Sequence, residues 1–152
     1  MPLRAPDYAF ARAELGAAIG PDTRLILLNT PHNPTGKVFS QAELGEIARL
    51  AIAHDLVVVT DEVYEHMTYD GTRHIPLATL PGMAERTVTI SSGGKSFGLT
   101  GWKVGWVHAP TELVGAVHTV KQHLSFPSGA PFQRAMVPAL DLGDGHFPGL
   151  AD

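Results

Sequence analysis

The sequence predicts an incomplete three-layer α/β/α domain, in which helices cover both faces of a mostly parallel sheet. The first observation is a set of four short runs, at Leu25–Asn29, Leu56–Thr60, Thr87–Ser91 and Val104–His108. These runs are almost continuously apolar or β-branched, which is typical of strands buried on both faces. The second is an amphipathic helix pattern between the first two runs, since strand-helix-strand units build parallel sheets.

The helix between the first two strands is expected over Ser40–His54. Ser40 and Glu43 have the spacing of a capping box, in which two side chains satisfy backbone groups at the helix start. A second amphipathic helix is expected over Thr111–Leu124, after the fourth strand. The segment Val63–Arg86 contains two turn signals and is expected to be mainly loop, with at most a short helical turn. One face of the first helix is apolar, as contact with a core requires, and carries Leu44, Ile47, Ala48 and Ala51.

Composition limits the classes of protein to which the chain can belong. Its 152 residues are enough for one domain with a core, and 44% apolar with 17% charged residues is typical of a globular protein. A net charge of -4 disfavours nucleic-acid binding, which needs clustered cations. No apolar run approaches the roughly 20 residues of a membrane span, and cysteine is absent. We expect a soluble, cytoplasmic protein that binds neither nucleic acid nor membrane.

Polar side chains follow three of the predicted strands. Asn33 comes after the first strand, Asp61 and Tyr64 after the second, and Ser92 and Lys95 after the third. Asn33, Asp61 and Lys95 are separated by 28 and 34 residues, close to the roughly 30 residues of a strand-crossover-strand unit. Since ligands bind outside the carboxyl ends of parallel strands, we expect these residues to meet at one edge of the sheet.

These residue types together suit a ring-shaped aldehyde cofactor. A lysine whose pKa is lowered by burial or nearby cations can bond an aldehyde carbon. An aspartate can keep a pyridine nitrogen protonated, and Ser92 with Lys103 could neutralise a phosphate. The eight histidines show no pair at i, i+4 spacing around a glutamate, so no metal site is expected.

Three motifs carry a resemblance to a known family. They are Asn-Pro-Thr-Gly at 33–36, Asp-Glu-Val-Tyr at 61–64 and Ser-Gly-Gly-Lys-Ser-Phe-Gly-Leu-Thr-Gly-Trp-Lys-Val-Gly-Trp at 92–106. In this order and spacing they resemble the class I/II aminotransferases, which are pyridoxal 5'-phosphate (PLP) enzymes of fold type I. The chain is most similar to the branch with kynurenine, methionine and succinyldiaminopimelate aminotransferases, which often carry Gly-Trp-Lys where others have an arginine. The resemblance spans about residues 25–133.

The resemblance implies a catalytic role for Lys95 and a cofactor-binding role for six residues. It implies that Lys95 bonds PLP and later moves the Cα proton, while Asp61 pairs with the pyridine nitrogen. It also implies that Tyr64 and Asn33 contact the ring O3' oxygen and that Asn33 contacts the substrate carboxylate. Ser92 and Lys103 are implied to contact the phosphate.

The family also implies that residues 1–152 are part of a larger protein. Its members have a longer N-terminal part of the large PLP-binding domain and a small C-terminal domain, both expected to be absent here. The small domain supplies the arginine that clamps the substrate carboxylate, and Arg134 is not expected to replace it. We therefore expect a transaminase core for an amino acid and a 2-oxo acid that is inactive alone and belongs, at full length, to a homodimer.

Several alternatives stay open at this point. Related folds use the same residues in a PLP-dependent carbon-sulfur β-lyase, and a third possibility is a non-catalytic vestigial fragment with exposed sheet edges. A nucleotide hydrolase is disfavoured, because the phosphate-loop pattern that ends in Gly94-Lys95-Ser96 needs glycine where position 89 has threonine. Taken singly, Asn-Pro-Thr-Gly is an ordinary turn, Asp61-Glu62 is a cap or a salt-bridge partner, and Lys95 after two glycines is an anion-binding loop.

Overall fold

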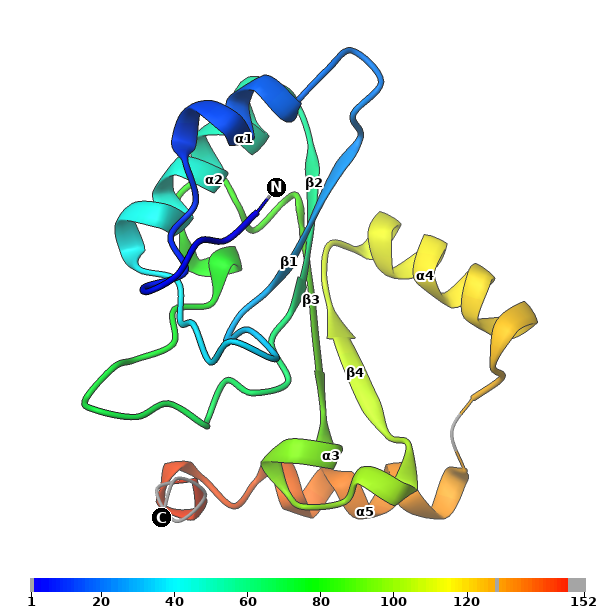
Figure 1. The fold of residues 1–152 in the computed structure, drawn as a ribbon. Coiled ribbons are helices and arrows are strands. Elements are labelled where there is room, and N and C mark those ends of the chain that lie inside the picture. Colours follow the sequence, from blue (N-terminus) through cyan, green and yellow to red (C-terminus); the bar gives the residue numbers. More distant parts are fainter. Residues whose placement is uncertain (1, 128, 148–152) are drawn as a thin grey trace.

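The computed structural model describes residues 2–127 and 129–147, and Figure 1 shows a sheet with helices on both sides. In sheet order the strands are β1 (Leu25–Asn29), β2 (Val57–Asp61), β3 (Thr87–Ser92) and β4 (Gly105–His108). The first three are parallel neighbours, and β4 runs antiparallel to β3. The prediction of an α/β fold with a mostly parallel sheet is therefore confirmed, and each strand boundary lies within one residue of its expected place.

Both predicted helices are present, and the described residues also form three further α-helices and three short 3-10 turns. The described helices are α1 (Arg12–Ala18), α2 (Gln41–Ala53), the single turn α3 (Gly93–Ser96), α4 (Thr111–Leu124) and α5 (Ala130–Leu140). The segment 63–86 is mainly loop with one 3-10 turn at Leu77–Thr79, as predicted. Across the described ranges, no helix combines the length and apolar character that crossing a membrane requires.

The hydrophobic core lies between the sheet and α2. Helix α1 lies on the same side of the sheet as α2, while α4 lies on the other side (Figure 1). The apolar face predicted for α2 is the face that packs, because its leucine, isoleucine and alanines are almost fully buried. The residues of this core that are at most 2% exposed are Leu44, Ile47, Ala51, Leu56, Val58, Leu77 and Met83.

The expectation that every strand is buried on both faces is wrong for β4, which has no buried residue, and for β1. Successive side chains of a strand point to opposite faces, and Leu28 is buried on the α2 side. Leu25 and Leu27 point the other way and are 52% and 73% exposed. Helix α4, on that side of the sheet, has no buried residue. The second helical layer is thus only partly formed by the described residues, and an apolar run alone does not reveal this.

The start of α2 carries the predicted capping box. The Ser40 N–H donates to Glu43 Oε2 at 2.9 Å, and the Glu43 N–H donates to Ser40 Oγ at 3.3 Å. Lys37 Nζ lies 2.8 Å from Glu43 Oε1. Partial burial raises the pKa of the Glu43 carboxyl, but hydrogen bonds from Lys37 and Ser40 outweigh this and hold the pKa below its ordinary value.

Replacing Glu43 by glutamine is expected to make the free energy of unfolding depend less on pH in the acid range. Because the folded pKa lies below the unfolded value of about 4.3, the carboxylate stabilises the fold above that pH, and the effect is lost as pH falls through the folded pKa. Urea unfolding of Glu43→Gln and wild type should differ by about 1 kcal/mol at neutral pH and converge below about pH 4. The exposed Asp22→Asn is the control. A constant difference at all pH values would contradict this prediction.

Candidate functional site

The carboxyl ends of β1, β2 and β3 lie side by side at one edge of the sheet. The three strands are adjacent and parallel, so Asp61 at the end of β2 and the segments with Asn33 and Lys95, which follow β1 and β3, lie at this edge. Lys103 lies at the same edge, although it comes before a strand and not after one. It precedes the antiparallel strand β4, whose first residue Gly105 pairs with Ser92 at the end of β3. Because β4 runs antiparallel to β3, a second lysine lies at this edge of the sheet.

A network of amide groups holds the ends of β1 and β2 together. Asn29 Nδ2 donates to the Asp61 carbonyl at 3.0 Å, and Asn29 Oδ1 accepts from the Asn33 N–H at 2.8 Å. The Asp61 carboxylate accepts a hydrogen bond from the Val63 N–H at 3.3 Å. Gly36 has φ +72°, a conformation that favours glycine, and its N–H donates to the His32 carbonyl to close the 33–36 turn. Local hydrogen bonds therefore orient both Asn33 and Asp61.

Lys95 lies in α3, a single helical turn that follows directly from β3. Neighbouring atoms come close to two glycines around it: the flexible end of a methionine at Gly93, and a backbone oxygen at Gly105, where a side chain has no room. A Cβ on Gly93 would lie 2.8 Å from Met136 of α5, and one on Gly105 would lie 2.8 Å from the Ser91 carbonyl oxygen. The Thr100 hydroxyl donates to the Gly94 carbonyl at 2.9 Å. Close packing with α5 and β4 thus sets the position of the turn that carries Lys95.

A pocket of about 670 Å³ opens at this edge between the sheet and α4. Four predicted site residues line it: Asp61, Ser92, Lys95 and Lys103. These four residues combine one carboxylate with two lysines and a hydroxyl, a set that matches an anionic ligand carrying a protonated nitrogen.

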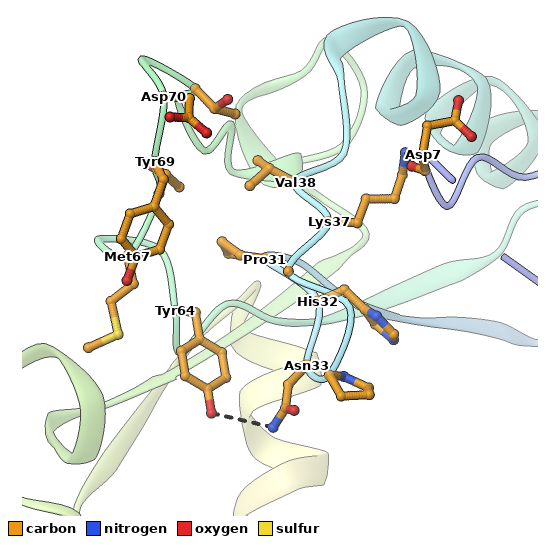
Figure 2. Close-up of a pocket in the computed structure, with 14 residues that line it drawn as sticks. Asp7, Pro31, His32, Asn33, Lys37, Val38, Tyr64, Met67, Tyr69 and Asp70 are labelled. Carbon is orange, nitrogen blue, oxygen red and sulfur yellow. Dashed lines mark hydrogen bonds between the residues drawn. The ribbon is translucent and has the colours of Figure 1, made fainter. Parts of the chain in front are cut away.

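Tyr64 and Asn33 line a second pocket of about 620 Å³. Figure 2 shows their side chains pointing toward each other, with Asn33 Nδ2 donating to the Tyr64 hydroxyl at 3.4 Å. The Lys95 ammonium lies 5.3 Å from the centre of the Tyr64 ring, within cation–π range. Tyr64 therefore connects this pair to Lys95, although the two groups line different pockets.

Some residues at this edge were not predicted from the sequence. Asn29 makes hydrogen bonds with both Asp61 and Asn33. In the sequence, the one feature that could have indicated this role is a single amide side chain at the end of an apolar strand. Trp106 and Thr100 line the pocket with Lys95, as do His118 and Lys121 of α4. The helical pattern of α4 gave no sign that these two polar residues face the sheet edge.

Comparison with known proteins identifies the family of this chain. The family model for aminotransferase class I and II matches residues 4–144. A probable N-succinyldiaminopimelate aminotransferase of Mycobacterium tuberculosis is 53% identical over 137 residues, which are 90% of this chain and 34% of the relative. A kynurenine–oxoglutarate transaminase of Dictyostelium discoideum is 50% identical over 132 residues, with coverages of 86% and 30%. The chain thus spans about a third of the length of these relatives.

Solved structures show the same architecture. The N-succinyldiaminopimelate aminotransferase of M. tuberculosis superimposes with a TM-score of 0.91 at 51% identity, over 95% of this chain and 38% of that structure. The Escherichia coli protein YbdL, described as having a methionine aminotransferase function, gives a TM-score of 0.92 at 35% identity, with coverages of 99% and 40%. With the sheet edge, the motifs and these similarities in agreement, the chain belongs to the aminotransferase class I and II family.

Proposed function

We propose that residues 1–152 are part of the large domain of a PLP-dependent transaminase, which moves an amino group between an amino acid and a 2-oxo acid. The observation that carries this proposal is the convergence of Asp61, Ser92, Lys95 and Lys103 on one pocket. The donor set fits PLP, because the cofactor has a basic ring nitrogen, an aldehyde and a phosphate. PLP supplies an electrophilic aldehyde and a ring that takes up electrons.

Each residue then has a role that its chemistry supports. Lys95 Nζ would bond the aldehyde carbon and later move the proton at the substrate Cα. The Asp61 carboxylate would hold the proton on the ring nitrogen. Ser92 Oγ would donate to the phosphate, and Lys103 would offset its charge.

Tyr64 and Asn33 are proposed to contact the O3' oxygen from the other side of Lys95. Their mutual hydrogen bond and the closeness of the Tyr64 ring to Lys95 support this assignment. Asn33 would in addition contact the substrate carboxylate. The substrates of relatives, among them N-succinyldiaminopimelate, kynurenine and methionine, define the panel in which the amino donor should be sought.

The chain by itself is proposed to bind the cofactor with little or no turnover. Arg134, the one arginine that follows Lys95 in the sequence, lies on α5 and lines neither of the two pockets. It is therefore poorly placed to clamp a substrate carboxylate. For the full-length protein we propose a homodimer in the cytoplasm.

Borohydride reduction in the presence of PLP, followed by peptide mass mapping, tests the proposal. The chain has four lysines, Lys37, Lys95, Lys103 and Lys121, so each candidate is distinguishable. We expect the phosphopyridoxyl label on Lys95 at PLP concentrations too low to label the other three. A label distributed evenly over all four, or none, would contradict the proposal. In the full-length protein, release of thiol and ammonium from cysteine conjugates would indicate carbon-sulfur lyase activity, whereas transamination would pass the amino group to the acceptor 2-oxo acid.

A further inference from the structure

A buried carboxylate and a buried imidazole face each other next to the proposed cofactor pocket. Glu62 follows Asp61 at the end of β2, and its side chain is fully buried. Its Oε2 atom lies 2.7 Å from Nε2 of His74, whose side chain is 5% exposed. Within residues 2–127 and 129–147, Glu62 Oε1 and His74 Nδ1 have no hydrogen-bond partner. Each side chain therefore depends on the other for its polar contact.

The two groups are stable in this setting only as a pair. A buried polar side chain without a hydrogen-bond partner is strongly destabilising, and the 2.7 Å contact gives each of these two side chains a partner. Loss of His74 would leave Glu62 buried without a hydrogen-bond partner. Replacement of Glu62 by glutamine would instead keep a hydrogen bond to the imidazole.

The pair joins the two ends of a loop that carries part of the proposed site. At the first end, the Glu62 N–H donates to the Ile90 carbonyl at 2.8 Å, which fastens the loop to β3. At the other end, His74 precedes Leu77, which is fully buried in the core. Residues 63–73 lie between these anchors. They include Tyr64 and a large part of the wall of the second pocket (Figure 2).

Several contacts hold this loop, among them the stacking of His66 on Phe147 with ring centroids 3.6 Å apart. Glu65 accepts a hydrogen bond from the Ser91 hydroxyl at 2.6 Å, which fixes the first turn to β3. The Glu62–His74 pair closes the loop at its base. We propose that this pair is a positioning element, which closes residues 63–73 and thereby holds Tyr64 beside Lys95. The part played by Tyr64 rests on the function proposed above, while closure of the loop does not.

Hydrogen exchange of the cofactor-free chain, followed by mass spectrometry, tests the proposal. Within the loop, the Met67 N–H donates to the Tyr64 carbonyl and the Thr72 N–H to the Tyr69 carbonyl, so both amides report on loop opening. For His74→Leu we expect exchange in peptides from 63–73 to rise about tenfold or more, with α2 and β1 within about twofold of wild type. The matched control is Arg73→Leu, an exposed cation beside His74.

Glu62→Gln is the conservative variant, and its loop exchange should stay within about threefold of wild type. Unchanged loop exchange in His74→Leu, or equal acceleration in the loop, α2 and β1, would overturn the proposal. So would Glu62→Gln loosening the loop as much as His74→Leu does. If His74→Leu does not fold, His74→Ala takes its place, because it likewise removes the nitrogen that contacts Glu62. No arm uses PLP, so failure of the proposed function would leave these results interpretable.

Discussion

Replacing Lys95 by arginine is expected to abolish covalent attachment of PLP to the chain. Attachment needs an amine that can lose its proton, and a guanidinium stays protonated. Arginine keeps the positive charge and much of the length, so a loss of labelling would reflect the bonding chemistry. After borohydride reduction, the Lys95→Arg chain should carry less than about a twentieth of the wild-type label. In the full-length enzyme, turnover should fall by about ten-thousandfold or more.

The control for this experiment lies in the same pocket. Lys121 of α4 also lines it, and its Nζ donates to Ser125 Oγ at 3.0 Å. Lys121→Arg should therefore retain the label at Lys95. If Lys95→Arg and wild type incorporate equal amounts, another lysine bonds the cofactor and the central assignment is wrong.

Replacing Leu44 by alanine is expected to give the largest loss of stability among single substitutions in α2. Leu44 is 0% exposed and belongs to the face of α2 that packs on the sheet. Removing its isobutyl group loses buried apolar contact and leaves a cavity, at a cost of about 2–5 kcal/mol in the free energy of unfolding. Urea unfolding followed by circular dichroism measures the difference.

Ile52 provides the comparison on the same helix. It is 46% exposed, so Ile52→Ala should lower the free energy of unfolding by less than about 1 kcal/mol. Equal losses for the two variants would mean that α2 does not pack on the sheet through the predicted face. Since α2 supports β1 and β2, whose ends orient Asn33 and Asp61, Leu44→Ala should also weaken PLP binding.

Part of the proposed site could be predicted from the spacing of the motifs along the sequence. Asn33, Asp61 and Lys95 follow three neighbouring parallel strands, so their spacing along the chain was enough to predict their meeting at one edge. The direction of β4 was not predictable in the same way, because a short apolar run has no direction. Its antiparallel course is what brings Lys103 to Ser92.

Other features depend on contacts between segments that are distant in the sequence. Glu62 and His74 are 12 residues apart, and His74 lies in a segment without regular periodicity, so no pattern links them. Met136 of α5 packs against Gly93, and α5 itself has a proline in its interior, at Pro138, which obscures its helical signal. Such contacts are decided by packing, which local sequence does not encode.

The sequence by itself determined the fold class, the two long helices and the three motifs that identify the family, because periodicity and motif order are local properties. Only the tertiary structure decided which faces of the strands are buried, how the predicted residues divide between two pockets, and which side chains support them. Leu25 and Leu27 make the difference plain, since they are as apolar as Leu28 yet lie on the open face. Whether an apolar side chain is covered depends on which segments pack over it in three dimensions.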